Sequence, residues 1–386
     1  MDGGDRLTLR VVDSLAEVEP TGWDACAGGN PFVTHAFLQA LEQSGSATAE
    51  TGWLPQHLLL EDSDGQLIGA TPLYVKSHSY GEYVFDHGWT AAYERAGGRY
   101  YPKLQVAVPF TPVPGPRLLL HPNAPPESRR QLIGGLVAVA KRTGVSSLHV
   151  TFPTADDCDA FVAAGFLRRI GRQFHWENQG FSTFDDFLAV LNARKRKQIK
   201  RERRDANAAV TIELLSGDDL KSRHWDAFFR FYISTSDRKW GPPYLTRAFF
   251  DLLGERMANR VLLVMAKHDD RYVAGALNLI GSDTLYGRNW GCIGDFPFLH
   301  FEACYYRAIE FAIACGLKRV EAGAQGEHKI QRGYLPQPTY SAHWIRDAGF
   351  RQAVEDFLQR ESVAVKSEME ELEEGLSPFR RDRDGS

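Results

Sequence analysis

The sequence predicts a mixed α/β protein made of two tandem domains that arose by internal duplication. The chain has 386 residues, which is more than one average domain contains. Its hydrophobic content of 43% and charged content of 24% are ordinary for a globular protein. Four segments of the first half recur in the same order in the second half, and each has the periodicity of a helix or a strand. Four recurrences in register are not expected by chance, so they indicate duplication.

Each copy begins with a predicted helix. The segment PFVTHAFLQAL (31–41) recurs as PYLTRAFFDLL (243–253). Both contain a proline and then a threonine that can cap a helix, followed by apolar residues at helical spacing.

A β-hairpin and a further strand follow in each copy. HLLLEDSDGQLIGATPLYV (57–75) matches VLLVMAKHDDRYVAGALNLI (261–280), and each contains two strands around a polar turn. YVFDHGW and TLYGRNWG then predict one more strand each, ending at Trp89 and Trp290.

The first copy carries an insertion rich in proline and tyrosine, residues 91–126. Proline cannot donate a hydrogen bond to a neighbouring strand, so this segment is predicted to be a loop rather than a central strand. It can pack over its own domain or form a lid over a cleft, and the first alternative is favoured.

The last recurring pair is an apolar helix, a glycine and a strand, in LVAVAKRTGVSSLHV (136–150) and AIEFAIACGLKRVEA (308–322). The repeat predicts a first domain over residues 1–180 and a second over 210–350. Residues 351–386 are expected to form a helix to about Gly375 and then a disordered tail.

A basic helix is predicted at the junction, over residues 181–209. Thr183 and the acids that follow it form a near capping box. Phe184, Phe187, Leu188 and Leu191 line one face, which Ile199 can extend. This pattern predicts a single helix from about Thr183 to Asn207.

The junction helix concentrates positive charge. The eleven residues 194–204 sum to +7, whereas the remaining 375 residues carry −11. A solvated linker helix would normally mix charges of both signs, and Glu202 is the one acid available for pairing within the run. The run therefore favours a polyanionic partner: tRNA, the phosphates of a lipid-linked precursor, or an anionic membrane surface. A merely solvated junction is the alternative. The candidate anion-binding residues are Arg194, Lys195, Arg196, Lys197, Lys200, Arg201, Arg203 and Arg204.

Chemically functional side chains are densest in the second half. Acyl transfer to an amine needs a base for the ammonium proton and a donor or cation that stabilises the oxyanion. The candidate catalytic residues are Glu321, Glu327, His328, Lys329 and Arg332, of which Glu321, Glu327 and His328, together with Glu302, are the possible bases. The candidate substrate-binding residues are Arg288, Asn289, Trp290, His300, Glu302, Gln325 and Tyr334. Each alone could be a turn donor, a surface cation or a salt-bridge partner, but their clustering after a strand favours a site.

FLHFEACYY (298–306) followed by EAGAQGEHKIQRGYLPQPTYSAH (321–343) resembles the FemAB-like family of peptidoglycan biosynthesis or recognition proteins. That family lies within the superfamily of GCN5-related N-acetyltransferases (GNAT). NPFVTHAFLQALEQSG (30–45), PLYVKSHSYGEYVFDHGW (72–89) and the basic run fit the same pattern. The resemblance implies two tandem GNAT-like domains. It also implies transfer of an amino acid from aminoacyl-tRNA to the peptide of a lipid-linked cell-wall precursor.

The sequence departs from these relatives at two places. The family's F-K-x-x-F-like turn contains a lysine that stabilises the reaction centre. KIQRGY (329–334) occupies the comparable place here, with Gln331 at the position of that lysine. CoA-dependent relatives carry a Gln/Arg-x-x-Gly-x-Gly/Ala turn, but this chain has only Gly291 and Gly294 after its strand. Acyl-CoA is therefore the less favoured donor.

The resulting hypothesis is an acyl or aminoacyl transferase that acts on an amine in cell-wall metabolism. The alternatives are a CoA-dependent N-acyltransferase and a non-catalytic protein that binds peptidoglycan precursors. No resident cofactor is expected, because the acyl donor, aminoacyl-tRNA or acyl-CoA, is a substrate. Five scattered cysteines lack metal-ligand spacing, so no metal is expected. No signal peptide or apolar span is recognisable, which favours a cytoplasmic protein with at most peripheral membrane contact. The oligomeric state stays open.

Overall fold

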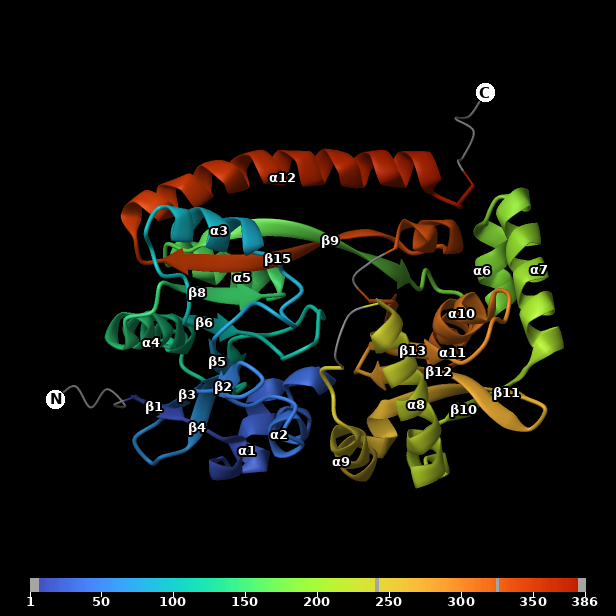
Figure 1. Ribbon diagram of the computed structural model, residues 1–386, viewed down its shortest axis with the longest axis horizontal. Helices are drawn as coiled ribbons and strands as arrows, with labels where there is room; N and C mark the ends of the chain where they lie inside the picture. Colours follow the sequence, from blue (N-terminus) through green and yellow to red (C-terminus); the bar gives the residue numbers. More distant parts are fainter. Residues whose placement is uncertain (1–6, 240–242, 324–325, 381–386) are drawn as a thin grey trace. The chain divides into compact units, whose positions relative to one another are not determined.

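The structure is a computed structural model that describes residues 7–239, 243–323 and 326–380 (Figure 1). It divides into two compact units. Unit 1 comprises Met1–Gly171, Tyr244–Phe249 and Pro338–Lys366, and unit 2 comprises Arg172–Pro243, Phe250–Gln337 and Ser367–Ser386. The sequence predicted contiguous domains, whereas both units are assembled from separate segments. The difference arises because four elements each begin in one unit and end in the other: β9 (Leu167–Glu177), α9 (Arg247–Met257), β15 (Leu335–Ile345) and α12 (Ala348–Leu376).

Unit 1 contains two sheets with helices packed against them. Its remaining elements are β1 (Thr8–Val12), α1 (Pro20–Ala27), α2 (His35–Gln43), β2 (Trp53–Pro55), β3 (His57–Glu61), β4 (Leu67–Thr71), β5 (Leu73–Lys76), α3 (His87–Arg95), β6 (Lys103–Val106), β7 (Leu119–Leu120), α4 (Ser128–Thr143), β8 (Ser147–Thr151) and α5 (Ala155–Ala163). One sheet has the order β1-β3-β4-β7, and the strands of the other follow β15-β8-β6-β5-β2. Leu136 of α4 and Leu104 of β6 belong to one buried core between these layers.

Unit 2 has a single run of strands, β10-β11-β12-β13-β14-β9. Its elements are α6 (Phe184–Val190), α7 (Ala193–Ala209), β10 (Thr211–Leu215), α8 (Ser222–Lys239), α9 (Arg247–Met257), β11 (Val261–His268), β12 (Arg271–Ile280), β13 (Thr284–Cys292), α10 (Leu299–Phe301), the π-helix η5 (Glu302–Tyr306), α11 (Arg307–Ala314), β14 (Arg319–Glu321) and the 3₁₀ helix η6 (Glu327–Arg332). Phe187 of α6, Ile199 of α7 and Leu285 of β13 share its core, which confirms the apolar face predicted for the junction.

The two units repeat the same pattern of strand pairing. In unit 1, β5 pairs antiparallel with β6, β6 pairs parallel with β8, and β8 pairs antiparallel with β15. In unit 2, β12, β13, β14 and β9 pair in the same senses. β4 and β5 together correspond to β12, because Pro72 interrupts the first copy between them. The predicted duplication is therefore confirmed. The repeat also shows that β9, which follows the first copy in the chain, completes the second sheet.

The predicted strand ending at Trp89 is wrong. Trp89 lies on α3, and the third strand of the first copy is β6, within the segment 91–126 that was predicted to be a loop. β6 can join a central position because its four residues lie between Pro102 and Pro109 and include no proline, and all four are buried. The segment without a counterpart in unit 2 is thus 77–102. It joins β5 to β6, whereas Gly281–Asp283 suffice to join β12 to β13.

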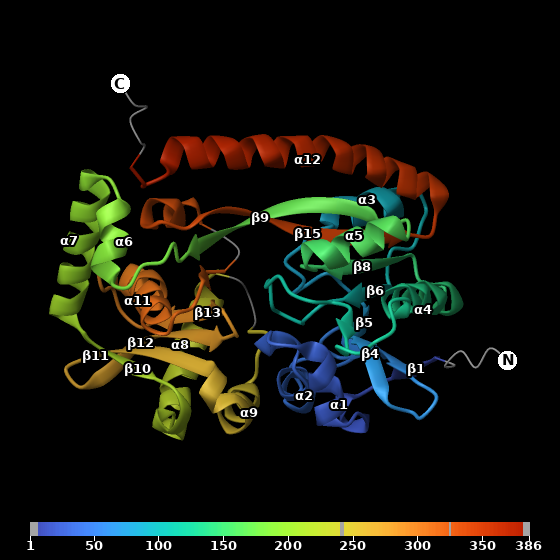
Figure 2. The same ribbon diagram turned by 180° about the vertical axis from the view of Figure 1, so that it is seen from behind.

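The junction is two helices rather than one. Thr183 and Asp186 form the predicted capping box of α6. The chain then becomes extended at Leu191, and the side chain of Asn192 accepts a hydrogen bond from the Lys195 amide to cap α7 (3.0 Å). The Asn192 amide donates to the carbonyl of Pro378, so a distant segment fixes the break (2.9 Å). Figure 2 shows α6 and α7 side by side near α11.

The predicted C-terminal helix is confirmed as α12, which ends at Leu376. The last part of the predicted disordered tail, residues 381–386, lies outside the described residues. Among the helices that are described, none is both long and apolar enough to cross a membrane.

Candidate functional site

The predicted site residues of the second copy surround the point where β13 and β14 separate. These strands pair in parallel from Thr284/Arg319 to Tyr286/Glu321. β14 ends there, whereas β13 continues to Cys292 and bulges at Arg288 and Asn289. Bulges reorient side chains and are common next to active sites. Arg288, Asn289 and Trp290 are half-buried on the continuing strand, so residues from β13, β14 and η6 can meet at this opening.

Lys329 of η6 is almost completely buried. Its Nζ donates a hydrogen bond to the carbonyl of Gly323, just beyond β14 (2.8 Å). Burial lowers the pKa of Lys329 to about 7, since an uncharged amine is easier to desolvate than an ammonium. A lysine with this pKa exchanges a proton near neutral pH, as a general base requires.

Glu321 is the last residue of β14 and is also buried, at 4% exposure. Among the residues that the structure describes, none forms a hydrogen bond with its Oε2, which lies 4.0 Å from Nε2 of His175 on β9. Burial raises the pKa of Glu321 to about 8 and lowers that of His175 to about 3. At pH 7 the carboxyl group is therefore protonated. Glu321 was predicted to be a possible base. In its protonated form it can donate a proton, and its catalytic role stays a prediction.

Aromatic side chains border the opening on the side of η5. The Tyr305 hydroxyl and His328 Nε2 form a hydrogen bond (2.9 Å). The His300 ring lies 5.2 Å from the Tyr305 ring and 5.4 Å from the Trp290 ring. Burial, with Arg332 and Lys329 nearby, lowers the pKa of His328. The structure thus brings together Trp290, His300 and His328, as predicted, and adds Tyr305 to them.

The π-helical turn η5 separates α10 from α11 and contains Cys304 and Tyr305. Such turns are rare and are frequently found at functional sites, because one extra residue in the turn redirects the side chains around it. Figure 1 shows α10 and α11 together beside β13.

Four predicted residues have structural roles or lie apart. Glu302 is fully buried and forms ion pairs with Arg203 (3.1 Å) and Arg307 (2.8 Å), so it is not a free base. Arg332 pairs with Glu202 (3.0 Å) and its guanidinium lies 3.4 Å from the Phe301 ring centre. Tyr334 is in the core. The Glu327 side chain is 58% exposed, 4.0 Å from Arg172. Gln325 lies outside the described residues.

Sequence reasoning missed His175, Cys304 and Tyr305. His175 lies 146 positions before Glu321 and meets it only through strand pairing, so no local spacing points to it. The duplication could have pointed to His175, because the first copy has a histidine at the equivalent place. His343 of β15 occupies the equivalent place in unit 1, opposite His149.

The basic residues of α7 fall into two groups. Lys195 is buried and donates to Gln331 of η6 (2.7 Å). Arg203 pairs with Glu302 and Glu310 and covers the Phe184 ring, while Arg196 is half-buried. Glu202 is the only acid within the run, as expected, but Glu302 and Glu310 of other elements also pair with its Arg203. The exposed group consists of Arg194, Lys197, Lys200, Arg201 and Arg204.

Gly291 and Gly294, the two glycines that follow Trp290, have different environments. A Cβ at Gly291 would lie 2.2 Å from the carbonyl oxygen of Phe231 on α8, so this glycine permits close packing of β13 on α8. Gly294 is exposed with a φ of 101°.

Fold and site together define a duplicated α/β protein whose second unit buries a lysine, Lys329 of η6, and a glutamic acid, Glu321 at the end of β14. The sequence matches the FemAB-like family, described as peptidoglycan biosynthesis/recognition, over residues 14–381, and the chain belongs to this family. The predicted resemblance is thereby confirmed. No curated protein matches the sequence.

Solved structures share the fold over most of the chain. FemX has a TM-score of 0.55 at 12% identity, covering 88% of this chain and 99% of its own. L-PGS from Bacillus licheniformis has a TM-score of 0.54 at 10% identity, covering 88% and 97%. The C-terminal domain (DUF2156) of a putative lysylphosphatidylglycerol synthetase from Agrobacterium fabrum has a TM-score of 0.54 at 10% identity, covering 89% and 96%. These likenesses concern the fold alone. The repeated strand pairing confirms the predicted mixed α/β class with two tandem domains, and the assignment of those domains as GNAT-like stays a prediction.

Proposed function

We propose that this chain transfers an acyl or aminoacyl group to an amine of a peptidoglycan precursor, at the opening between β13 and β14. The observation that carries the proposal is the pair of buried groups whose pKa values are displaced toward neutrality, Lys329 to about 7 and Glu321 to about 8. Perturbed pKa values of this kind cluster at catalytic sites. A base and an acid that both titrate near neutral pH are what amide formation from an ester needs.

In this proposal neutral Lys329 takes a proton from the ammonium of the acceptor, and the free amine attacks the donor carbonyl. The carbon–nitrogen bond forms and an oxyanion develops, which the backbone N–H groups near Gly323 and Gly326 can stabilise. Glu321 donates its proton to the departing oxygen as the ester bond breaks. The Glu321 carboxylate then removes the extra proton from the new amide nitrogen, and Lys329 releases its own proton to solvent.

The donor we favour is aminoacyl-tRNA. The exposed cations of α7 supply a surface for RNA phosphates, while Lys195 and Glu202 of the same helix contact Gln331 and Arg332 of η6. A donor held on α7 would therefore be held beside the turn that carries Lys329. Gly291 supports the same choice, since its packing against α8 accounts for this glycine without a pyrophosphate.

The test is a transfer assay with a muropeptide amine acceptor and two labelled donors in parallel, aminoacyl-tRNA and acetyl-CoA. Product is expected from aminoacyl-tRNA. Lys329→Met should lower kcat by about 100-fold or more, the usual contribution of a general base. The exposed neighbour Lys318 provides the control, because Lys318→Met should retain activity. Transfer from acetyl-CoA alone would establish the CoA-dependent alternative. Precursor binding without transfer from either donor would establish a binding protein.

A further inference from the structure

The segment 77–102 of unit 1 has no counterpart in unit 2. It joins β5 to β6, whereas the equivalent strands β12 and β13 are joined by Gly281–Asp283. Since the duplicated fold forms without such a segment, its structure needs a separate explanation. It consists of a loop, 77–86, and the helix α3.

Two buried lysines hold the loop in place. Lys103 of β6 donates to Ser79 and Glu82, each at 2.8 Å, and also pairs with Asp86. Lys76 of β5 donates to the carbonyl of Tyr80 (3.3 Å). Burying charges is costly unless they are paired and hydrogen-bonded, and here the acids that compensate the lysines come from the loop itself. The loop is therefore fixed to the strands that it connects.

This fixed loop presents aromatic rings to solvent. Tyr80 is 64% exposed and Phe85 is 60% exposed. Their neighbours Ser79, Glu82 and Asp86 point inward to Lys103, so the loop has a polar inner side and an aromatic outer side. Large exposed apolar groups rimmed by polar residues mark interaction surfaces.

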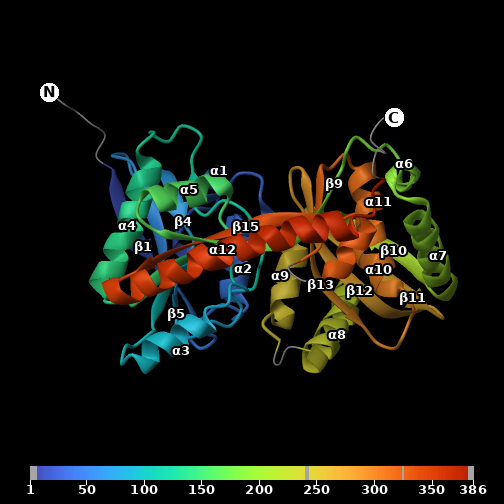
Figure 3. The same ribbon diagram turned by 90° about the horizontal axis from the view of Figure 1, so that it is seen from above.

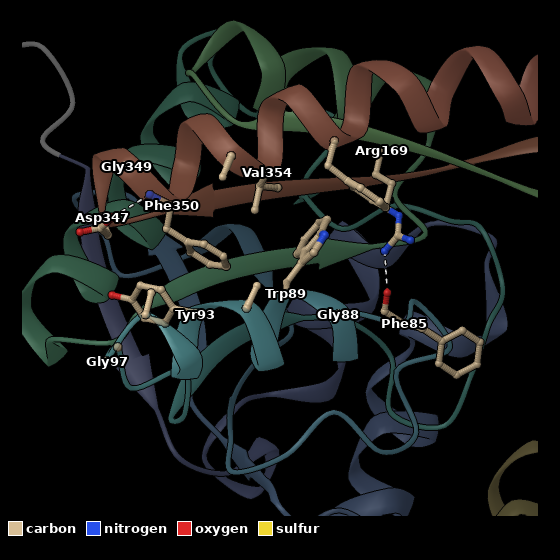
Figure 4. Close-up of a pocket in the computed structure, with 15 residues that line it drawn as sticks. Phe85, Gly88, Trp89, Tyr93, Gly97, Arg169, Asp347, Gly349, Phe350 and Val354 are labelled. Carbon is tan, nitrogen blue, oxygen red and sulfur yellow. Dashed lines mark hydrogen bonds between the residues drawn. The ribbon is translucent and has the colours of Figure 1, made fainter.

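A groove of about 940 Å³ adjoins Phe85. It lies between α3 and the first turns of α12, within unit 1 (Figure 4). Figure 3 shows these two helices from above. Gly88 and Ala92 of α3 and Ala96, its C-cap, follow one another at four-residue intervals and give the groove a lining of small residues. Trp89, Tyr93, Phe350, Val354 and Phe357 give it aromatic and aliphatic walls.

The charged groups that line the groove are already satisfied. Arg169 pairs with Glu361 (2.7 Å) and donates to the carbonyl of Phe85 (2.7 Å), as Figure 4 shows for the second contact. Asp347 accepts a hydrogen bond from the Phe350 amide at the start of α12 (2.7 Å). A sugar or nucleotide would need several convergent polar groups, which these residues do not offer. The groove is complementary to an uncharged, apolar chain.

We infer that this face of unit 1 binds the hydrocarbon chain of a membrane lipid, with Tyr80 and Phe85 placed in the bilayer interface. At about 30 Å³ for each water-sized group, the groove has room for roughly thirty heavy atoms, as in a long chain. Amphipathic aromatic side chains are the residues that settle at the interface between lipid and water. The site differs from the α7 surface because its driving force is apolar burial rather than charge.

The experiment measures binding of the full chain to vesicles of phosphatidylcholine alone at high salt, where α7 cannot contribute electrostatically. Vesicles with brominated acyl chains should quench the tryptophan fluorescence of the wild type. Most of that quenching should be lost in Trp89→Phe. Ala92→Phe, which fills the groove, and Tyr80→Ser/Phe85→Ser should each weaken binding by about tenfold or more.

Matched controls lie next to these positions. Ala91 is exposed on α3 like Ala92 but does not line the groove, and Val363 is 70% exposed on α12 outside the groove. Ala91→Phe and Val363→Ser should bind as the wild type does. Absence of vesicle binding, or equal binding by the Ala91 and Ala92 variants, would overturn the inference. So would self-association that Ala92→Phe abolishes, because the groove would then hold a second copy. The result does not depend on the transfer assay.

Discussion

Lys329 and Glu321 show how burial changes the chemistry of single residues. In water at pH 7 a lysine is a cation and a glutamate is an anion. Burial brings the pKa of Lys329 to about 7 and that of Glu321 to about 8, so at this pH Lys329 is half-neutral and Glu321 is mostly protonated. The sequence identified both residues from their clustering after a strand. It could not assign their protonation states, because these depend on burial in the folded chain and on charges from other elements, such as Glu177 of β9 beside Glu321.

Glu321→Gln tests the protonation state through stability. The pKa of Glu321 rises from 4.5 to about 8 in the folded protein. The native state therefore binds more protons than the unfolded state between these values, and its stability falls as pH rises across this window. Glutamine mimics the protonated form, so the variant should gain stability relative to wild type from pH 4.5 to 8, by up to roughly 4 kcal/mol.

The measurement is denaturant unfolding at several pH values across that window. Any cost of seating the glutamine amide is independent of pH and shifts the whole curve without changing its slope. The exposed Glu327→Gln variant is the control and should show no comparable trend. A difference between Glu321→Gln and wild type that is constant with pH would mean that Glu321 is ionised in the native state.

At the scale of elements, α7 exposes cations to solvent on one side and holds η6 in place through the other. Its outward cations were apparent from composition, but its inward contacts were not. Their partners lie at least 99 residues away in the chain: Glu302, Tyr306, Gln331 and Arg332. The break at Asn192 was missed for a related reason. The predicted apolar stripe continues across the break, and the Asn192 amide forms its hydrogen bond with the distant Pro378 carbonyl rather than within a helix. Local capping at Thr183 was predictable because all of its atoms come from adjacent residues.

Glu202 of α7 should be essential to the position of η6. It accepts hydrogen bonds from Gln198 (2.8 Å) and Arg332 (3.0 Å) and from the Tyr306 hydroxyl. Glu202→Gln leaves Arg332 as a buried cation without a charged partner, and removing one member of a buried pair costs about 3–5 kcal/mol. Asp205→Asn is the control on the same helix. Asp205 pairs with the exposed Arg204, so little change is expected there. Thermal or urea unfolding compares the two, and equal losses would contradict the role of Glu202.

The exposed face of α7 is expected to bind tRNA in a salt-dependent way. With three to five phosphates engaged, the log–log slope of affinity against salt should be roughly −2 to −3.5 for unpaired RNA. Replacing Arg194, Lys197 and Arg201 by Gln should weaken binding and flatten the slope, with the melting temperature nearly unchanged. Lys195 and Arg203 are excluded from this variant because they stabilise unit 2.

Filter binding of bulk tRNA at several salt concentrations measures this slope. If the triple variant binds tRNA with the affinity and salt slope of the wild type, the basic run is only a solvated surface. Preference for anionic vesicles over tRNA would identify the membrane surface as the partner of α7.

At the scale of the molecule, the duplication was predictable because each copy had to keep the apolar periodicity of its own core. The exchange of β9 and β15 was not, because neither strand belongs to a recurring segment and nothing in its local sequence indicates which sheet it joins. Only the pairing of β8 with β15 and of β14 with β9 reveals it. The exchange also explains why contiguous boundaries at 180 and 210 do not coincide with the compact units.

The exchange predicts that residues 1–180 cannot fold as a cooperative unit alone. In the full chain β15 covers one edge of β8 through the register Ser341/Thr151 to Ile345/Ser147, and Ala342 belongs to the core of unit 1. A fragment that ends after β9 lacks this strand and leaves the edge of β8 open, which favours aggregation. Co-expression of residues 181–386 supplies β15 without restoring the covalent link and is the matched control. We expect the two pieces to purify together with one cooperative unfolding transition, whereas 1–180 alone should be insoluble or lack near-UV circular dichroism. Cooperative folding of 1–180 alone would show that β15 is dispensable to unit 1 and that the boundary read from the sequence was sufficient.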